Sequence, residues 1–233
     1  MPIYQLHPDF VGFPERSEFE HDIVAVGGDL SVERLVEAYL CGVFPWYNNP
    51  GELHWYCPNE RCVLPVDAVK ISHSMRNAFN RNFFRYTMDT AFKDVMEACR
   101  SGEREGQTWI HDEVVEAYCK LHDIGMAHSL EVWKDDVLCG GLYGVSLGGI
   151  FFGESMFSRE PNASKAGLIQ LCRFLPQLEI HLVDCQVPND HLTSLGAVNL
   201  QRDAFLDQLE VLLQQPMVKG PWDEAFGNWL SSV

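Results

Sequence analysis

The spacing of apolar and polar residues in the first sixty positions predicts one clear helix. Ser31 suits the N-cap of this helix, and Gly42 suits its end. An apolar stripe at intervals of three and four residues indicates the buried face and consists of Val32, Leu35, Val36, Tyr39 and Leu40. The remainder of this region is rich in aromatic residues, proline and other turn formers, and no further element is assigned to it.

Three more helices are expected between residues 72 and 125. Their starts are predicted at Ser72, Thr90 and His111, and Gly102 and Gly125 are expected to end the second and third. The apolar stripes of the three consist of Met75, Ala78, Phe79 and Phe83, then Phe92, Val95, Met96 and Cys99, then Val114, Val115, Tyr118 and Leu121.

The pattern then changes to strands. Three runs at residues 127–133, 137–146 and 150–157 are separated by short turns, which predicts antiparallel pairing. A helix is expected over residues 163–175, and an apolar strand over 178–183 follows it. This order predicts an α+β fold with a mixed sheet flanked by helices. A boundary near Arg61 to Pro65 would divide a small N-terminal domain, 1–62, from a larger domain, 63–233.

Composition is that of a globular protein. Hydrophobic residues make up 46% and charged residues 21% of the 233 residues. No run of 18 apolar residues is present and the N-terminus lacks the features of a secretion signal, so neither a membrane span nor export is expected. A cytoplasmic protein is therefore expected. The eight cysteines show no CxxC pair, and we expect neither a disulfide framework nor a metal site.

The net charge of −16 restricts the choice of partner. Affinity for phosphate comes from Lys and Arg, so this charge argues against non-specific binding to nucleic acid, including DNA. An acidic surface suits a cationic partner, but it equally serves solubility alone.

Polar residues lie near the ends of two of the expected strands. Glu154 comes just after Phe151 and Phe152, where an apolar strand approaches its end, and Asp184 and Gln186 follow the apolar run 178–183. Alternation along a strand would put Asp184 and Gln186 on one face. Asn162 and Ser164 begin the helix between the two strands, and ligands collect at such strand ends. Each of these side chains could simply be hydrogen-bonded in a loop, but their convergence favours a functional site.

Several short motifs in this order resemble one known family. The chain is similar to the leucyl/phenylalanyl-tRNA–protein transferases in the segments FPW (44–46), TWI (108–110), HSLEVW (128–133), GGLYG (140–144), GESMFS (153–158) and NASK (162–165), and in DCQ, NDH and SLGA between 184 and 197.

The resemblance implies a fold, an activity and partners. Members of the family carry a small N-terminal domain followed by a domain like that of the acetyltransferase superfamily (GNAT-like). They move leucine or phenylalanine from Leu-tRNA or Phe-tRNA, held by the 3′ aminoacyl-adenosine end, to the N-terminal α-amine of proteins that start with Lys or Arg. The added residue marks the protein for degradation. No cofactor or metal is implied, because the aminoacyl ester is already activated. Neither DNA nor a membrane is an expected partner.

The resemblance also assigns catalytic roles. Gln186 would contact the attacking amine, and Asp184 would hydrogen-bond and polarise Gln186. Glu154 would attract the incoming Lys or Arg or its α-ammonium. An amide oxygen is a very poor base, so orienting the amine is the role we expect for Gln186 and Asp184.

The resemblance also implies substrate-binding residues, and the sequence leaves an alternative explanation for each of the two sets. The resemblance places the pocket for the aminoacyl side chain at Trp46, Trp109, Leu142, Phe151, Leu168 and Leu171. Ordinary core packing would also explain Leu168 and Leu171, and Leu171 departs from the aromatic residue common at its position. The tRNA-binding face of the family falls on the basic residues Lys70, Arg76, Arg81 and Arg85. This patch is thin, and a solvated helix face is the alternative reading.

Three rival functions remain on the sequence alone. An acyl-CoA N-acetyltransferase would share the fold, but the segment SREPNASKAG lacks a glycine-rich loop for pyrophosphate. A non-catalytic tRNA-binding module would not need Asp184 and Gln186 in a cleft. A sibling transferase for acidic N-termini is opposed by the charge of Glu154.

Overall fold

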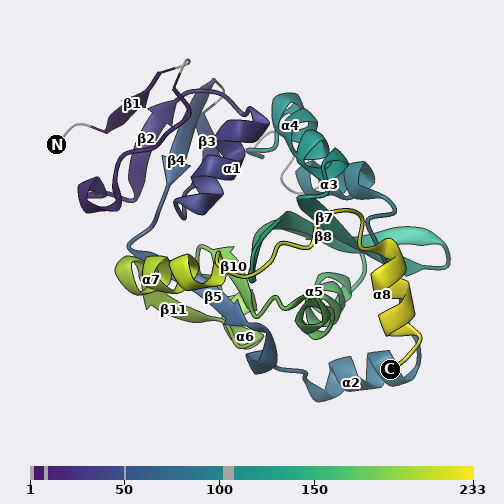
Figure 1. Cartoon of the computed structure of the whole chain (residues 1–233). Helices are drawn as coiled ribbons and strands as arrows, with labels where there is room; N and C mark the ends of the chain where they lie inside the picture. The colour runs from purple at the N-terminus through teal and green to yellow at the C-terminus, as the bar shows by residue number, and fades with distance from the viewer. Residues whose placement is uncertain (1–2, 8–9, 50, 102–107) are drawn as a thin grey trace.

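The computed structural model describes residues 3–7, 10–49, 51–101 and 108–233 and contains two β-sheets (Figure 1). The smaller sheet has four strands in the order β1-β2-β4-β3. The strands are β1 (Tyr4–Leu6), β2 (Ile23–Gly27), β3 (Phe44–Asn49) and β4 (Glu52–Tyr56). The sequence predicted none of them, because they are short and the segments between them are rich in turn formers.

The predicted helix of this region is confirmed as α1 (Val32–Leu40). The Ser31 side chain accepts a hydrogen bond from the backbone N–H of Arg34, as expected of an N-cap. Gly42 follows the helix with a φ of +72°, a conformation that suits glycine. Leu35, Ala38 and Tyr39 are fully buried, which makes this face of α1 part of the core.

The larger sheet has seven strands in the order β11-β5-β10-β9-β8-β7-β6. Its strands are β5 (Glu60–Pro65), β6 (Arg85–Met88), β7 (Ala127–Lys134), β8 (Val137–Leu147), β9 (Ile150–Ser158), β10 (Leu182–Gln186) and β11 (Val198–Gln201). Among the described strands of this sheet, β9 and β10 pair in parallel and the other neighbours pair antiparallel. The predicted mixed sheet and the α+β class are therefore confirmed.

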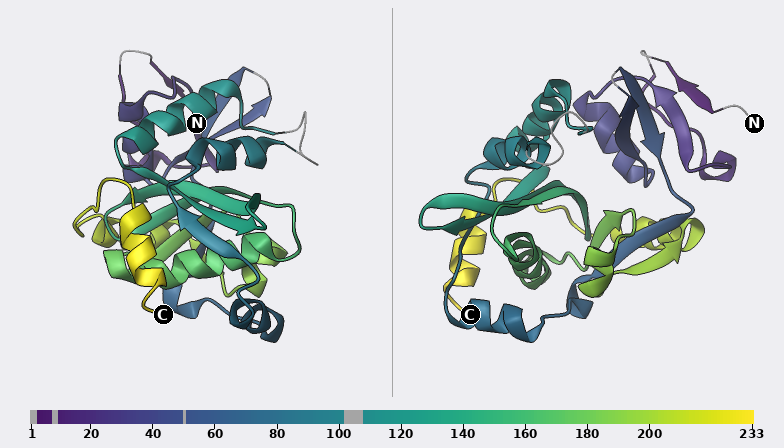
Figure 2. Two further views of the ribbon diagram at one scale, coloured as in Figure 1. Left: turned by 90° about the vertical axis from the view of Figure 1, so that its right-hand side faces the viewer. Right: turned by 180° about the vertical axis from the view of Figure 1, so that it is seen from behind.

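Helices cover both faces of the larger sheet. In Figure 1 and in the turned views of Figure 2, α3 (Phe92–Arg100) and α4 (Asp112–Asp123) lie on one face and α5 (Ala163–Phe174) lies on the other. The remaining helices are α2 (His73–Asn80), α6 (Asp190–Ser194), α7 (Arg202–Leu212) and α8 (Asp223–Leu230), with short 3₁₀ turns at Arg16–Glu18, Val66–Ala68 and Leu175–Leu178. None of the helices in the described ranges is both long enough and apolar enough to span a membrane.

Some predicted boundaries were wrong. The N-cap of α3 is Ala91 rather than Thr90, whose hydroxyl instead donates to Glu131. Phe83 lies beyond the end of α2 and is exposed. The predicted strand at 178–183 begins only at Leu182, because Leu178 belongs to a 3₁₀ turn. Gly102, expected to end α3, lies outside the described residues.

The predicted domain boundary at residue 62 stays a prediction. The fold shows that β5 begins at Glu60 and pairs with β10 and β11 in the larger sheet. Residues 60–62, assigned to the small domain from the sequence, therefore lie in the larger sheet.

Two irregularities in the strands aim side chains at one place. Ser155 pairs with Tyr143 and Gly153 with Gly144, so Glu154 is an extra residue on β9. On the other side of β9, the pairing of β10 with β5 shifts between Asp184 and Gln186. Bulges of this kind bend a strand and redirect its side chains.

The close approach of β8 to β9 beside this bulge requires a glycine at position 144. A Cβ at Gly144 would lie 2.1 Å from the carbonyl oxygen of Phe152 and 2.6 Å from the Phe151 ring. We therefore expect Gly144→Ala to lower the free energy of unfolding by about 1–3 kcal/mol, as overpacking typically does. Urea denaturation measures this change.

Gly227 provides the matched control, because a Cβ there meets no atom within 4 Å and the residue lies in helix α8. Gly227→Ala should raise the stability by about 0.5–1 kcal/mol. A Gly144→Ala variant as stable as the unchanged protein would show that the two strands do not approach as closely as described.

Candidate active site

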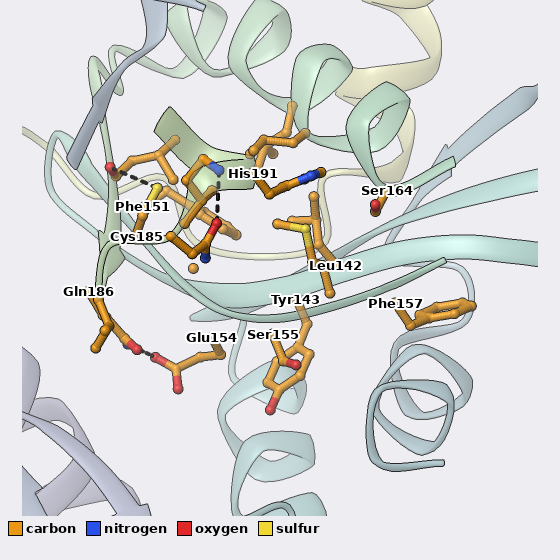
Figure 3. A pocket seen from close by; sticks show the side chains of 18 of the residues that line it. Leu142, Tyr143, Phe151, Glu154, Ser155, Phe157, Ser164, Cys185, Gln186 and His191 are labelled. Carbon is orange, nitrogen blue, oxygen red and sulfur yellow. Dashed lines mark hydrogen bonds between the residues drawn. The ribbon is translucent and has the colours of Figure 1, made fainter. Parts of the chain in front are cut away.

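A cavity lies where β9 and β10 separate. Their parallel pairing ends at Phe152 and Asp184, and beyond that point the strands diverge. The cavity between them has a volume of about 880 Å³. Residues of β8, β9, α5 and the segment after β10 line it, together with residues of β3 and of the segment before α4 (Figure 3).

One wall of the cavity is apolar. All six residues expected to hold the aminoacyl side chain line it, namely Trp46, Trp109, Leu142, Phe151, Leu168 and Leu171. The rings of Trp46 and Trp109 stack with their centroids 5.9 Å apart. Leu168 and Leu171 are buried by neighbouring residues while they line the cavity, so the core and the pocket share these side chains.

Polar residues also line the cavity, and we call the part of it at Glu154 and Gln186 the polar end. Glu154 and Gln186 both line it and point toward each other in Figure 3. The amide nitrogen of Gln186 donates a hydrogen bond of 2.8 Å to the Glu154 carboxyl. The side chains of Glu154 and Gln186 therefore meet as expected, but Glu154 lies within β9 and not at its end.

The expected pairing of the Asp184 and Gln186 side chains was wrong. Asp184 is fully buried, and its carboxylate accepts a hydrogen bond of 2.9 Å from the backbone N–H of Gln186 instead. Gln186 has a φ of +61°, which breaks the alternation of the strand and turns its side chain toward Glu154. A left-handed conformation is uncommon for glutamine, so surrounding contacts must hold it.

Arg61 supplies that support and was missed in the sequence. Its guanidinium group donates two hydrogen bonds, of 2.8 and 2.6 Å, to the Asp184 carboxylate, and both side chains are fully buried. It also donates to the carbonyl of Gly42 at 3.0 Å and lies against the rings of Phe44 and Phe205. Burial alone would lower the pKa of Arg61, but the charge and hydrogen bonds of Asp184, together with the nearby Cys57 and Glu154, outweigh burial and raise the pKa. The sequence did contain a signal for this residue, because an arginine inside an apolar strand must find a buried partner.

Two buried tyrosines complete the polar end. Tyr39 of α1 donates to one Glu154 oxygen at 2.7 Å, and Tyr118 of α4 donates to the other at 3.0 Å. Burial raises the pKa of Glu154 to about 7, although the hydrogen bonds from Tyr39, Tyr118 and Gln186 oppose this rise. Both tyrosines lie on apolar helix stripes, where the sequence indicated ordinary core residues.

The four basic residues expected to contact tRNA lie apart from the cavity lining. Lys70, Arg76, Arg81 and Arg85 are exposed, in or beside α2 and at the start of β6. Arg85 is paired with Asp136 at 3.2 Å. Within the described ranges, no group of three or more His, Cys, Asp or Glu residues is arranged to hold a metal ion.

Comparison with family models assigns the chain to an enzyme family. The model described as leucyl/phenylalanyl-tRNA protein transferase matches residues 63–210, and the model of the N-terminal domain of the same family matches residues 28–59. Residues from both matched segments line the cavity. The protein is thus a transferase. It belongs to the leucyl/phenylalanyl-tRNA–protein transferase family.

Individual relatives agree with this assignment. The chain is 49% identical to the leucyl/phenylalanyl-tRNA–protein transferase of Syntrophus aciditrophicus, with 95% of this chain and 94% of the relative covered. It is 48% identical to the one of Flavobacterium psychrophilum, with 86% and 96% covered. It is 45% identical to that of Maridesulfovibrio salexigens, with 98% and 97% covered.

Solved structures resemble the chain in fold. FemX matches with a TM-score of 0.51 at 9% identity, over 73% of this chain and 66% of its own. A metagenomic aminoglycoside acetyltransferase matches with a TM-score of 0.40 at 12% identity, over 48% of this chain and 84% of its own. The similarity to FemX concerns the fold alone.

The buried ion pair leads to a stability prediction. Arg61→Met should lower the free energy of unfolding by about 3–5 kcal/mol, because Asp184 then stays buried without a partner. The double variant Arg61→Met with Asp184→Leu should be more stable than Arg61→Met alone, since it removes the unpaired charge. Denaturant unfolding measures both.

Arg16→Met is the control for the loss of an arginine. Arg16 pairs with Asp203 and Asp207, which are both largely exposed, so its loss should cost no more than about 1 kcal/mol. If Arg61→Met costs as little as Arg16→Met, the ion pair does not support the turn at Gln186.

Proposed function

We propose that this protein moves leucine or phenylalanine from Leu-tRNA or Phe-tRNA to the N-terminal α-amine of proteins that start with Lys or Arg, and thereby marks them for degradation. One observation carries the proposal: a single cavity joins an apolar, aromatic wall to a polar end with a carboxyl and an amide. Such a cavity suits an apolar aminoacyl group beside a cationic amine.

The apolar wall is proposed as the pocket for the donor side chain. Trp46 and Trp109 stack at the cavity, and Leu168 and Leu171 line it from α5. Burial of a leucine or phenylalanine side chain there is worth about 1.5–3 kcal/mol. Leucine rather than an aromatic residue at position 171 enlarges the pocket at this point.

The polar end is proposed as the site of the amine. The Gln186 amide nitrogen is engaged with Glu154, which directs the amide oxygen to accept a hydrogen bond from the attacking amine. The Glu154 carboxyl, in its ionised form, attracts the cationic N-terminus or the basic side chain next to it. Asp184 acts through the backbone of Gln186 and not through its amide, so it has a positioning role.

The proposed reaction requires only that the protein bind and orient an activated ester and an amine. An aminoacyl ester reacts with a neutral amine without a covalent enzyme intermediate, so no cofactor or metal is part of the proposal. The α-ammonium group has a reference pKa of about 7.7–8.0 and must lose a proton before it attacks. Holding the amine close to the ester carbonyl converts an encounter in solution into a reaction between fixed neighbours.

The exposed basic residues on and near α2 are proposed to contact the tRNA backbone. Lys70, Arg76 and Arg81 are exposed, while Arg85 shares its charge with Asp136. A small number of phosphate contacts, opposed by the net charge of −16, predicts a modest affinity for tRNA. This affinity should decrease as the salt concentration rises.

A transfer assay with matched peptides tests the function. Radiolabelled Leu-tRNA is incubated with the protein and with peptides that differ only in the first residue, which is Arg, Lys, Asp or Ala. We expect label on the Arg and Lys peptides and none on the Asp peptide, because Glu154 repels an acidic side chain. Uncharged tRNA should compete, and EDTA should leave the transfer unchanged.

An Arg peptide with an acetylated N-terminus is the control, since it keeps the side chain but lacks the nucleophile. Label on the acetylated peptide, or equal label on the Asp and Arg peptides, would contradict the proposal. A thermal shift with CoA, together with no transfer from Leu-tRNA, would favour an acyl-CoA transferase instead.

A further inference from the structure

The carboxyl of Glu154 and the hydroxyls of Tyr39 and Tyr118 form a closed ring, which we call the Glu154 ring. Tyr39 Oη lies 2.5 Å from Tyr118 Oη and 2.7 Å from Glu154 Oε1, and Tyr118 Oη lies 3.0 Å from Glu154 Oε2. Gln186 Nε2 also donates to Oε1. The two tyrosines are fully buried, while Glu154 is half-buried and lines the cavity.

The protonation state of Glu154 decides whether each oxygen–oxygen contact in the ring contains a hydrogen. With Glu154 as a carboxylate, the ring has two phenol protons for three oxygen–oxygen contacts. One contact then lacks a hydrogen, and two oxygen atoms within hydrogen-bonding distance repel each other without one. A third proton on Oε2 completes the ring: Glu154 donates to Tyr118, Tyr118 to Tyr39, and Tyr39 to Oε1.

The charged and titratable groups around Glu154 favour such a shared proton. Burial raises the pKa values of Tyr39, Tyr118 and Tyr143, so these phenols stay neutral at physiological pH. On the side of β10 and β5, the Asp184 charge disfavours ionisation of Glu154, while Arg61 pairs with that charge. Glu154 is thus the group of this cluster that gains and loses a proton near neutral pH.

We propose that the Glu154 ring accepts the proton that the incoming α-ammonium must lose before it attacks the ester. The proposal rests on the proposed function, and it gives Tyr39 and Tyr118 a part in proton transfer. An N–H bond of the ammonium breaks, its electron pair stays on nitrogen, and an O–H bond forms on Glu154. The ring passes from two protons to three.

The remaining proton transfers balance without another reactant. After attack, the new C–N bond has formed and the C–O bond to the ribose breaks. The ribose oxygen takes the electron pair of that bond and a second proton from nitrogen. The ring then returns its proton to water. Because the α-ammonium and Glu154 have similar pKa values, near 8 and about 7, the first transfer costs little energy.

The test is the pH profile of single-turnover transfer to an Arg-initiated peptide. In the unchanged protein the rate should rise with pH and reach half its maximum near pH 7, where Glu154 becomes a carboxylate. In Glu154→Gln the rate should follow the amine alone, with the midpoint near pH 8. The ratio of the rate of the unchanged protein to the rate of Glu154→Gln should therefore fall by about tenfold between pH 6 and pH 9, because the two midpoints differ by about one pH unit.

Glutamine preserves the ring while removing the titration, since its amide donates to Tyr118 and accepts from Tyr39. A second variant, Tyr118→Phe, removes a hydrogen bond that lowers the pKa of Glu154, so its midpoint should move to a higher pH. Tyr86→Phe is the matched control, because Tyr86 is a partly buried tyrosine on β6, outside the cavity lining. Its profile should not move.

The outcomes separate the two proposals. If the unchanged protein labels no peptide at any pH, the proposed function fails. If it transfers leucine but Glu154→Gln shows the same deficit at every pH, the ring does not take the proton and only this inference fails. An unmoved midpoint in a folded Tyr118→Phe variant would likewise overturn it.

Discussion

The buried ion pair between Arg61 and Asp184 is the interaction on which the site depends. It joins β5 to β10, and the guanidinium group also holds the carbonyl of Gly42 and packs on Phe44, so the region around α1 is tied to the larger sheet. The same carboxylate accepts the backbone N–H of Gln186 and stabilises its left-handed conformation. Either charge would strongly destabilise the fold if it were buried without the other, so Arg61 and Asp184 act as a unit.

The polar end of the cavity follows from this constraint. The turn at Gln186 directs its amide to Glu154, which the bulge in β9 has already turned toward the cavity. Tyr39 and Tyr118 reach the same carboxyl from α1 and α4. Segments far apart in the sequence therefore meet at one carboxyl group, and the smaller N-terminal region contributes Tyr39 to this cluster and Trp46 to the cavity lining.

The sequence predicts those parts of the molecule that local patterns determine. Helix α1 and strands β7 to β9 follow from apolar periodicity and turn residues, and the apolar lining follows from family resemblance. Alternation failed at Gln186, because a bulge interrupts the strand where Asp184 accepts its backbone N–H. Arg61, which pairs with Asp184, and Tyr39, one of the partners of Glu154, lie more than one hundred residues away along the chain, and no local pattern encodes such contacts.

The central claim is that the Gln186 side chain orients the attacking amine. The most direct measurement is single-turnover transfer of leucine to an Arg-initiated peptide by Gln186→Ala, with a thermal melt beside it and Gln214→Ala, on the exposed surface, as the control. Loss of a polar contact made in the transition state should lower the rate by about 10²–10³ while the variant stays folded. Normal transfer by a folded Gln186→Ala variant would contradict the account and leave Gln186 as a structural residue at a strand end.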